Sequence, residues 1–512
     1  MADIYFIGMD NGGTSVKAGV YDEKGNEIAT ANTRVTQINP HDGWIERDIE
    51  EVWQANCLAV RKVLDKSGID PAKIKGVAAT GYGNGIFLIN AKKEPAYKNC
   101  ILSGDMRAKD YIKKYLREGS IGRIVGRTKQ SIWAGQAAPL LAWMKDNEPE
   151  VMKETSYVLM CVDYLRMKLT GQIGMEISNA SGLSCMDLDT RRFEKEIFQE
   201  LGIEEWLPCF PETIVPSAGI AGTVTEEAAK ATGLLAGTPV MGGLFDVTAC
   251  AIACGLTDSE KLCVVLGTWS INEYISRTPI AKEDFFMSSI YCMDEYYLEL
   301  EGSTTSASNL QWFVDHFMQE EKKEMEAQGK DVYDACEAML ESVPYDDSSI
   351  LFLPFLYGTN VSLDARAGFI GLTGRHTKAH MLRAVYEGIL FSHMHHIEKL
   401  MADKKDKTAC VRVAGGGCGS SGWMQMFADA LQLPIEVPAG KELGAMGAAM
   451  CVAVGSGCYK DFREASAEFT RIKKVYQPNP QRAAYYQEKY RIYKTLTAKL
   501  DEIWEQWNVL ER

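Results

Sequence analysis

The chain has 512 residues, of which 46% are hydrophobic and 24% charged, and its formal net charge is −14. This length exceeds one ordinary core and predicts two large domains or one domain with insertions. The acidic balance, without an offsetting basic patch, argues against nucleic acid or an anionic membrane as a partner. The first residues lack the features of a signal peptide, no apolar run approaches the ~20 residues of a membrane span, and the cysteines form no C-x-x-C pair. We therefore expect a soluble, cytoplasmic protein.

The first elements in chain order are short strands and one amphipathic helix. Strands are predicted at residues 4–10 and 17–22, on either side of a glycine-rich loop, and a third at 27–35 completes an antiparallel meander. Asp48 and a glutamate three residues later have the spacing of a helix start, and apolar residues then recur on one helical face. A further strand is predicted at 74–82.

The rest of the chain predicts a second unit that begins like the first. Residues from about 100 to 235 are expected to be mostly helical, with breaks at Gly and Pro. A strand at 238–243, a helix of small residues at 244–255 and a second hairpin at 261–275 follow, and the tail from Phe469 is largely helical and charged. Because both halves begin with a strand, a Gly-Thr turn and a strand, the sequence indicates an internal duplication.

The opening loop has the composition of an anion-binding turn. Backbone N–H groups around Asn11, Gly12, Gly13 and Thr14 can converge on one phosphate, since glycine permits positive φ and close approach. An ordinary Asn-Gly hairpin turn explains this loop alone equally well. The loop is not a Walker A motif, because it lacks G-x-x-x-x-G-K-[ST].

Asp10 distinguishes the two interpretations. A carboxylate beside a phosphate is electrostatically unfavourable unless a hydrated Mg²⁺ bridges them, and Mg²⁺ binds one or two carboxylates together with substrate phosphates. Lys17 falls on the same strand face and can neutralise a phosphate oxygen. The second hairpin repeats the turn at Gly267-Thr268, so two such loops can bind the phosphates of one nucleotide from both sides.

A third glycine cluster supports a competing interpretation. Residues 417–422 fit G-x-G-x-x-G between a predicted strand and helix, and Glu436 follows at the next strand end, as in dinucleotide-binding oxidoreductases. That interpretation leaves the Asp10 and Gly267 loops unexplained. One ATP held by two phosphate loops, with this cluster near its adenosine, explains all three.

Asp246 lies where a strand passes into a helix of small residues. It can be an N-cap, a general base that accepts the proton of a substrate hydroxyl during phosphoryl transfer, or both. Tyr82, Asn84 and Asp105 follow predicted strands and can project into one cleft, and Trp133 can offer an apolar wall to a sugar, although a core Trp is the simpler interpretation. The histidines at 393, 395 and 396 lack a third ligand of suitable spacing for a metal.

A set of motifs occurs in order along nearly the whole chain. The motifs are Asp10-Asn-Gly-Gly-Thr14, Gly43-Trp-Ile-Glu-Arg-Asp48, Asp163-Tyr-Leu, Leu169-Thr-Gly171, Gly242-Gly-Leu-Phe-Asp246, Gly267-Thr268, Ala414-Gly-Gly-Gly417 and Glu442-Leu-Gly-Ala-Met-Gly-Ala448. Together they resemble the FGGY family of carbohydrate kinases. The resemblance implies an α/β fold of two actin-like (ribonuclease H-like) ATPase domains with an interdomain cleft, ATP and Mg²⁺ as cofactors, and transfer of the γ-phosphate to a sugar or polyol hydroxyl. We expect a sugar-binding domain at 1–250 and an ATP-binding domain with a helical tail at 251–512.

The resemblance also assigns roles to individual residues. It implies Asp246 as catalytic base, with Tyr82, Asn84, Asp105 and Trp133 as further candidates to bind substrate. It places Asp10 near the metal. The residues implied to approach the nucleotide are Gly12, Gly13, Thr14, Lys17, Gly267, Thr268, Gln311, Gly416 and Gly417.

The substrate is the least determined feature. Gly83-Asn84 stands where glycerol kinases have an Arg-Glu pair, and Tyr82-Gly83 stands where D-xylulose kinases have a Met-His pair. The motifs around Phe245, Trp269 and Tyr357 look most like the L-xylulose (3-keto-L-gulonate) kinase branch. D-xylulose, L-ribulose, erythritol and glycerol stay as alternative acceptors, and an NAD-dependent oxidoreductase or an actin-like or chaperone-like ATPase as alternative classes. The sequence leaves open whether the protein forms a homodimer.

Overall fold

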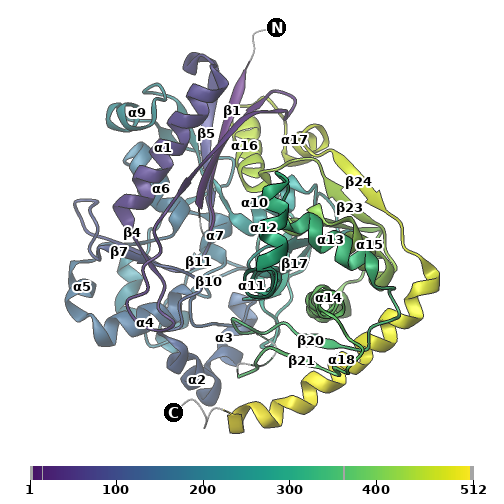
Figure 1. Ribbon diagram of the computed structural model, residues 1–512. Helices are drawn as coiled ribbons and strands as arrows, with labels where there is room; N and C mark the ends of the chain where they lie inside the picture. Colours follow the sequence, from purple (N-terminus) through teal and green to yellow (C-terminus); the bar gives the residue numbers. More distant parts are fainter. Residues whose placement is uncertain (1–3, 14, 361, 363, 508–512) are drawn as a thin grey trace. The chain divides into compact units, whose positions relative to one another are not determined.

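A computed structural model describes residues 4–13, 15–360, 362 and 364–507, and it divides the chain into two compact units (Figure 1). The division differs from a single boundary near residue 250, because two later segments pack with the first half. Unit 1 comprises Met1–Thr257, Ile275–Glu299 and Gly440–Arg471, and unit 2 comprises Asp258–Tyr274, Leu300–Ala439 and Ile472–Arg512.

The main sheet of unit 1 has the strand order β13-β14-β5-β1-β2-β3, and β15 also pairs with β5. Its strands are β1 (Tyr5–Asn11), β2 (Ser15–Asp22), β3 (Glu27–Arg34), β5 (Ile74–Gly81), β13 (Ile220–Thr223), β14 (Pro239–Met241) and β15 (Leu244–Phe245). The meander β1-β2-β3 is antiparallel, and β5 runs parallel to β1, which confirms the predicted start of the chain.

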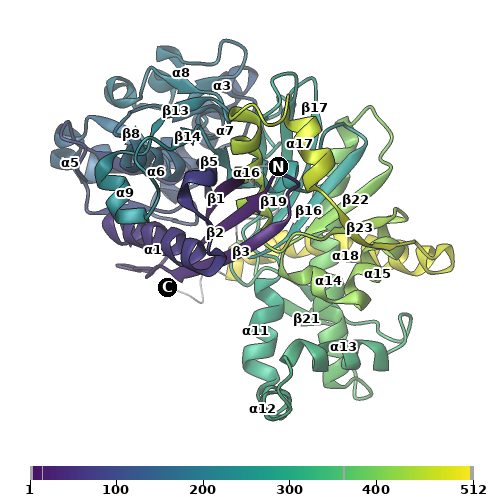
Figure 2. The ribbon, with the colours of Figure 1, turned by 90° about the horizontal axis from the view of Figure 1, so that it is seen from above.

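Helices from both ends of the chain cover this sheet. Helix α1 packs on β2 and β3, whereas α16 packs on β1 and β5 (Figure 2). Asp48 caps α1 by accepting hydrogen bonds from the amides of Glu50 and Glu51, as the sequence predicts. The helices around the sheet are α1 (Ile49–Ser67), α6 (Cys161–Thr170), α9 (Glu226–Thr232), α10 (Asp246–Ala253), α16 (Leu443–Gly455) and α17 (Phe462–Phe469).

A second hydrophobic core of unit 1 lies among helices of the middle segment. The segment is mainly helical, as predicted. The strand before Asp105, β7, was also predicted, whereas the short strands from β8 to β12 were not. The remaining elements of unit 1 are β4 (Glu46–Asp48), β6 (Phe87–Ile89), β7 (Asn99–Ile101), α2 (Lys109–Glu118), α3 (Ser120–Thr128), α4 (Ala137–Asn147), α5 (Pro149–Glu154), β8 (Tyr157–Leu159), β9 (Met175–Glu176), α7 (Ile177–Ser181), β10 (Met186–Asp187), β11 (Arg192–Phe193), α8 (Lys195–Glu200), the 3₁₀ helix Glu204–Cys209, β12 (Ile214–Val215) and β18 (Met287–Ile290).

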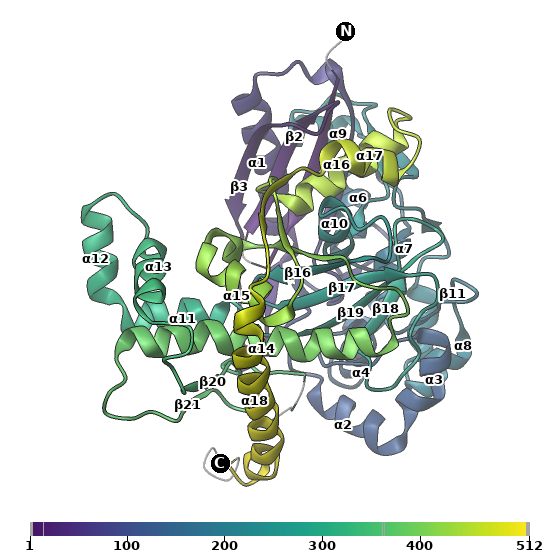
Figure 3. The same ribbon diagram turned by 90° about the vertical axis from the view of Figure 1, so that its right-hand side faces the viewer.

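Unit 2 is built on strands in the order β19-β17-β16-β22-β23-β24. The long helix α14 packs against α11, α13 and α15 (Figure 3). The elements are β16 (Lys261–Leu266), β17 (Ser270–Ser276), β19 (Tyr297–Ser303), α11 (Ser308–Phe317), α12 (Gln319–Ala327), α13 (Val332–Ser342), β20 (Leu351–Leu353), β21 (Gly368–Ile370), α14 (Lys378–Asp403), β22 (Cys410–Ala414), α15 (Ser421–Leu431), β23 (Ile435–Pro438), β24 (Ile472–Tyr476) and α18 (Pro480–Trp507). Among the described residues, no helix is both long and apolar enough to cross a membrane.

Candidate active site

Because side chains alternate between the two faces of strand β1, Asp10 faces helix α16. Ile7 and Met9 belong to the hydrophobic core that α1 shares, so Gly8 and Asp10 face the opposite side of the sheet. A Cβ atom on Gly8 would overlap the carbonyl oxygen of Ala445, and one on Gly444 would lie 2.5 Å from Asp10 Oδ2. The Asp10 carboxylate therefore packs directly against the first turn of α16.

Lys17 and Glu442 flank Asp10. Lys17 stands opposite Asp10 in the β1-β2 register, and its Nζ lies 2.7 Å from Glu442 Oε2. Both side chains are partly exposed, so the lysine can exchange its partner for another anion. A role for Lys17 was predicted from the sequence, but none for Glu442, which stood there only as the first residue of a motif of the family resemblance.

Asp246, the first residue of α10, is electrostatically linked to Asp10. Burial, and secondarily the charge of Asp10, raises the pKa of Asp246 from 3.8 to about 8, although the Val247 amide donates to its Oδ1 over 2.8 Å. Burial also raises the pKa of Asp10 to about 6, against the effect of Lys17. A divalent cation would stabilise the charged form of both carboxyl groups, which their surroundings disfavour. The oxygen donors therefore fit Mg²⁺.

The glycine-rich loop after β1 is held by a buried arginine. The Arg47 guanidinium donates to the carbonyl oxygen of Gly12 over 3.2 Å and also to that of Gly13, and Arg47 is 1% exposed. The Gly12 amide closes the turn onto the Ser15 carbonyl oxygen over 3.1 Å. Arg47 therefore holds the carbonyl side of the loop, and the Gly12 amide is engaged within the turn. Thr14, predicted here, lies outside the described residues, and no role for Arg47 was assigned from the sequence.

Two predicted substrate residues are engaged within the protein. Tyr82 is buried in the hydrophobic core, its hydroxyl contacts Cys100 Sγ at 3.6 Å, and the Arg47 guanidinium lies 5.7 Å from the centre of its ring. Asp105 is 0% exposed, and its carboxylate accepts hydrogen bonds from Arg107 and from the Ile45 amide. Both residues are thus buried and have partners within the protein, and their contact with a sugar stays a prediction.

Asn84 and Trp133 retain polar atoms that the protein does not satisfy. Asn84 is buried with φ 61°, and its Oδ1, like Trp133 Nε1, has no hydrogen-bond partner among the described residues. The Gly85 amide donates to the Gly135 carbonyl oxygen over 3.0 Å, which joins the two loops that carry these side chains. The Trp133 ring stacks on Phe286, with centroids 4.6 Å apart. A buried acceptor and a buried donor on adjoining loops are what a sugar-binding site needs.

The second Gly-Thr turn, in unit 2, joins β16 to β17. The carbonyl oxygen of Gly267 accepts from the Ala307 amide over 3.0 Å, and that of Thr268 accepts from the Ser306 amide over 2.9 Å. Thr268 itself is exposed. The start of α11 thus holds the turn by its carbonyl groups, as Arg47 holds the first loop.

Gly416 and Gly417 follow β22, in the 3₁₀ helix Gly416–Gly419, before α15. The helix N-terminus, where a dinucleotide-binding site would place a pyrophosphate, instead contacts a carboxylate: Glu337 Oε1 accepts from the Gly422 amide over 2.6 Å, and Oε2 accepts from Ser420 Oγ over 2.6 Å. A pyrophosphate would meet this negative charge, so the geometry argues against the oxidoreductase alternative.

Gln311 lies on α11 with an exposed side chain. The Tyr333 hydroxyl donates to its Oε1 over 2.7 Å, and its Nε2 donates to Asp315 Oδ2 over 2.9 Å. Gln311 is therefore oriented within unit 2 and accessible at its surface.

The fold is that of solved sugar kinases. A ligand-bound xylulose kinase from Lactobacillus acidophilus has the same fold, with a TM-score of 0.88 over 98% of this chain and 99% of that chain at 23% identity. The FGGY family of carbohydrate kinases, N-terminal domain, matches residues 5–253, and its C-terminal domain matches residues 262–456.

Two relatives match over almost their whole length. The L-xylulose/3-keto-L-gulonate kinase of Escherichia coli (strain K12) is 36% identical over 97% of both chains. The probable L-xylulose kinase of Pasteurella multocida (strain Pm70) is 35% identical over 97% of this chain and 99% of the relative. The chain belongs to the FGGY family of carbohydrate kinases, which confirms the predicted family, fold and enzyme class.

Proposed function

We propose that this ATP-dependent sugar kinase phosphorylates a primary hydroxyl of a ketose, with L-xylulose or 3-keto-L-gulonate as the preferred acceptor. The names of the two relatives support this acceptor, since both match nearly the whole chain. D-xylulose, L-ribulose, erythritol and glycerol are the acceptors to be tested beside them.

The observation that carries the mechanism is the raised pKa of Asp246 beside Asp10. A carboxyl group whose pKa of about 8 is close to neutral pH is matched to general base catalysis, because it can accept a proton and release it again. Asp246 would take the proton of the sugar hydroxyl as the phosphoryl group transfers. Asn84 Oδ1 and Trp133 would orient the sugar in unit 1.

Asp10 would hold Mg²⁺, which neutralises charge on the transferring phosphates when it is bound with ATP. Gly12, Gly13 and Lys17 would approach the phosphates from unit 1. In unit 2, Gly267 and Thr268 would approach the phosphates, and Gly416, Gly417 and Gln311 would line the adenosine site.

Replacement of Asp246 by Asn tests the base. Because the amide keeps the shape but cannot accept the proton, turnover should fall by about 10²–10⁴ while sugar binding, measured by calorimetry, changes little. Asp70→Asn is the control, since Asp70 caps a short 3₁₀ helix elsewhere in unit 1. Near-normal turnover of Asp246→Asn would remove the base assignment. An ADP-release assay over the six acceptors, in the wild-type protein, would identify the substrate.

A further inference from the structure

The segment that leads into Asp246 is fixed by side chains from other parts of unit 1. Arg166 Nη1 donates to the Gly242 carbonyl oxygen over 2.9 Å, and Thr80 Oγ1 donates to that of Leu244 over 2.9 Å. The Phe245 amide donates to Ser178 Oγ over 3.0 Å. Since Phe245 directly precedes Asp246, the last of these contacts acts one residue from the proposed base.

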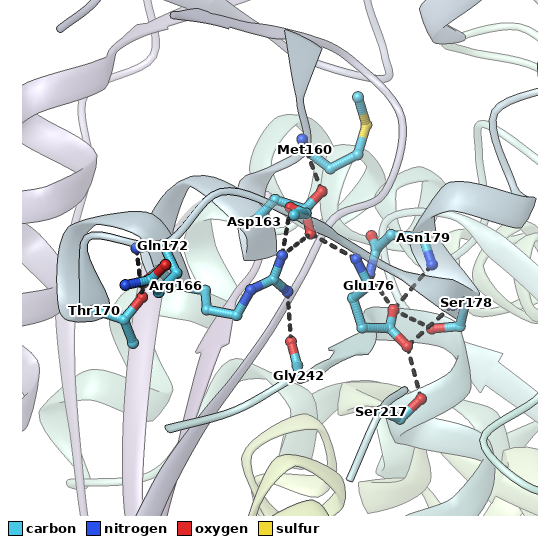
Figure 4. A network of polar contacts seen from close by, with 11 residues as sticks. Met160, Asp163, Arg166, Thr170, Gln172, Glu176, Ser178, Asn179, Ser217 and Gly242 are labelled. Atoms are coloured by element: carbon cyan, nitrogen blue, oxygen red, sulfur yellow. Dashed lines mark hydrogen bonds and ion pairs between the residues drawn. The ribbon is translucent and has the colours of Figure 1, made fainter. Parts of the chain in front are cut away.

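Ser178 is itself oriented by Glu176 (Figure 4). The Ser178 hydroxyl donates to Glu176 Oε2 over 2.6 Å, and this donation uses its only hydrogen. The lone pairs of Ser178 Oγ are therefore free to accept from the Phe245 amide. Glu176 is 0% exposed and also accepts from Ser217 Oγ over 2.6 Å and from Asn179 Nδ2 over 2.9 Å, which fixes its carboxylate.

A second arm of the same network reaches Gly242. Asp163 Oδ1 lies 3.0 Å from Arg166 Nη2 and accepts from the Glu176 amide over 2.8 Å, so the two arms share the backbone of Glu176 (Figure 4). The shape of the segment thus depends on buried polar contacts at both of its ends.

We propose that Ser178, oriented by Glu176, is a positioning residue for phosphoryl transfer. It fixes the Phe245 amide and hence the direction in which Asp246 leaves the strand and enters α10. The inference rests on the proposed role of Asp246. It adds that Ser178 and Glu176 orient the Asp246 carboxylate.

Ser181 provides a matched control on the same helix. Like Ser178 it is 0% exposed, and its hydroxyl accepts a backbone amide from a distant segment, that of Ile290, over 2.9 Å. It also donates to the Ser178 carbonyl oxygen over 3.0 Å. Ser181→Ala therefore removes a comparable buried contact that does not lead to Asp246.

The experiment measures kcat, KM for sugar and ATP, and Tm for Ser178→Ala and Ser181→Ala, each in the wild-type and in the Asp246→Asn background. We expect Ser178→Ala to lower kcat about 10- to 100-fold with KM for ATP unchanged, and to have no further effect on the residual turnover of Asp246→Asn. Ser181→Ala should lower Tm by a similar amount but keep kcat within about twofold.

Equal kcat in the two alanine variants, or an equal loss in both backgrounds, would overturn the positioning role and leave the base assignment intact. Normal turnover of Asp246→Asn would instead overturn the proposed function itself. If Ser178→Ala does not fold, Glu176→Gln decides, because it keeps the shape of Glu176 but weakens its hold on the Ser178 hydroxyl. It should lower kcat in the wild-type background only, and an unchanged kcat would overturn the inference.

Discussion

Asp246 is the residue whose protonation should be visible in the kinetics. Its pKa is raised to about 8, first by burial and then by the charge of Asp10. We expect kcat/KM for the sugar to rise with pH with a midpoint far above 3.8, the ordinary value of an aspartate. In Asp10→Asn the midpoint should shift to lower pH in the residual activity, because that charge is removed. A pH profile with a midpoint near 4 would contradict this assignment.

The same shift predicts how stability depends on pH. Well below pH 3.8, Asp246 carries its proton in both the folded and the unfolded chain, and between 3.8 and about 8 mainly the unfolded chain releases it. The contribution of Asp246 to stability thus falls as pH rises through this range and is at its minimum above pH 8. Asp246→Asn should therefore raise Tm at pH 8.5, by about 1–2 °C for each kcal/mol gained, and change it much less at pH 4. A Tm difference that is independent of pH would contradict the raised pKa.

Single residues were predictable where the chemistry is local. Asp10, Lys17 and Asp246 stand in short patterns whose charge and spacing have a chemical reason. Arg47 and Glu442 stand in motifs of the family resemblance, but their roles were not predicted because their partners are far away along the chain. Only the fold brings Arg47 to the glycine loop and Glu442 to Lys17.

At the scale of elements, α16 can approach β1 closely because glycines lie at their contact. Gly8→Ala would place a methyl group on the backbone of Ala445, and we expect it to lower the free energy of unfolding by about 1–3 kcal/mol. Gly444→Ala would instead press on the Asp10 carboxylate, so activity at limiting Mg²⁺ should fall more than stability.

Gly126 offers the control for both variants. It lies inside α3, and an added Cβ would have nothing within 4 Å, so Gly126→Ala should leave activity unchanged and stabilise the protein slightly. Denaturant unfolding and ADP release measure the two effects. Equal losses of activity in Gly8→Ala and Gly444→Ala at matched stability would contradict a specific effect on Asp10.

Elements were predictable where the pattern lies within one segment. The meander, α1 and the second hairpin follow from alternation, capping and turn residues that are adjacent in the sequence. Strand β24 was missed, because its exposed lysines resemble those of a surface helix or loop, and it becomes a strand only by pairing with β23. The short strands β8, β9 and β12 likewise depend on distant partners.

At the scale of the whole molecule, the sequence order does not follow the compact units. Unit 1 is completed by a segment near the end of the chain, because α16 packs on β1 and β5 and α17 packs on α10 and α16. No local pattern marks such a return of the chain, so the sequence predicted one boundary where the structure has several.

This connectivity predicts the behaviour of a fragment. Residues 1–257 alone lack α16 and α17 and would expose the α16 side of the sheet, so the fragment should bind ANS and lose cooperative thermal unfolding. Joining residues 440–471 to it through a flexible linker should restore a cooperative transition, whereas linking residues 476–507, which include α18 and have the same length, should not. Cooperative unfolding of residues 1–257 alone would contradict the structural role of α16.

The pairing of Lys17 with Glu442 has a consequence for how the enzyme recognises its nucleotide. In the proposed role, a phosphate oxygen takes over the ammonium group from a carboxylate that already holds it in place. Binding is then an exchange of one anion for another, in which the lysine needs little reorientation and releases little bound counterion. The contribution of this contact to ATP affinity should accordingly depend only weakly on salt concentration. A ligand with little negative charge should bind Lys17 poorly, because it must compete with the Glu442 carboxylate.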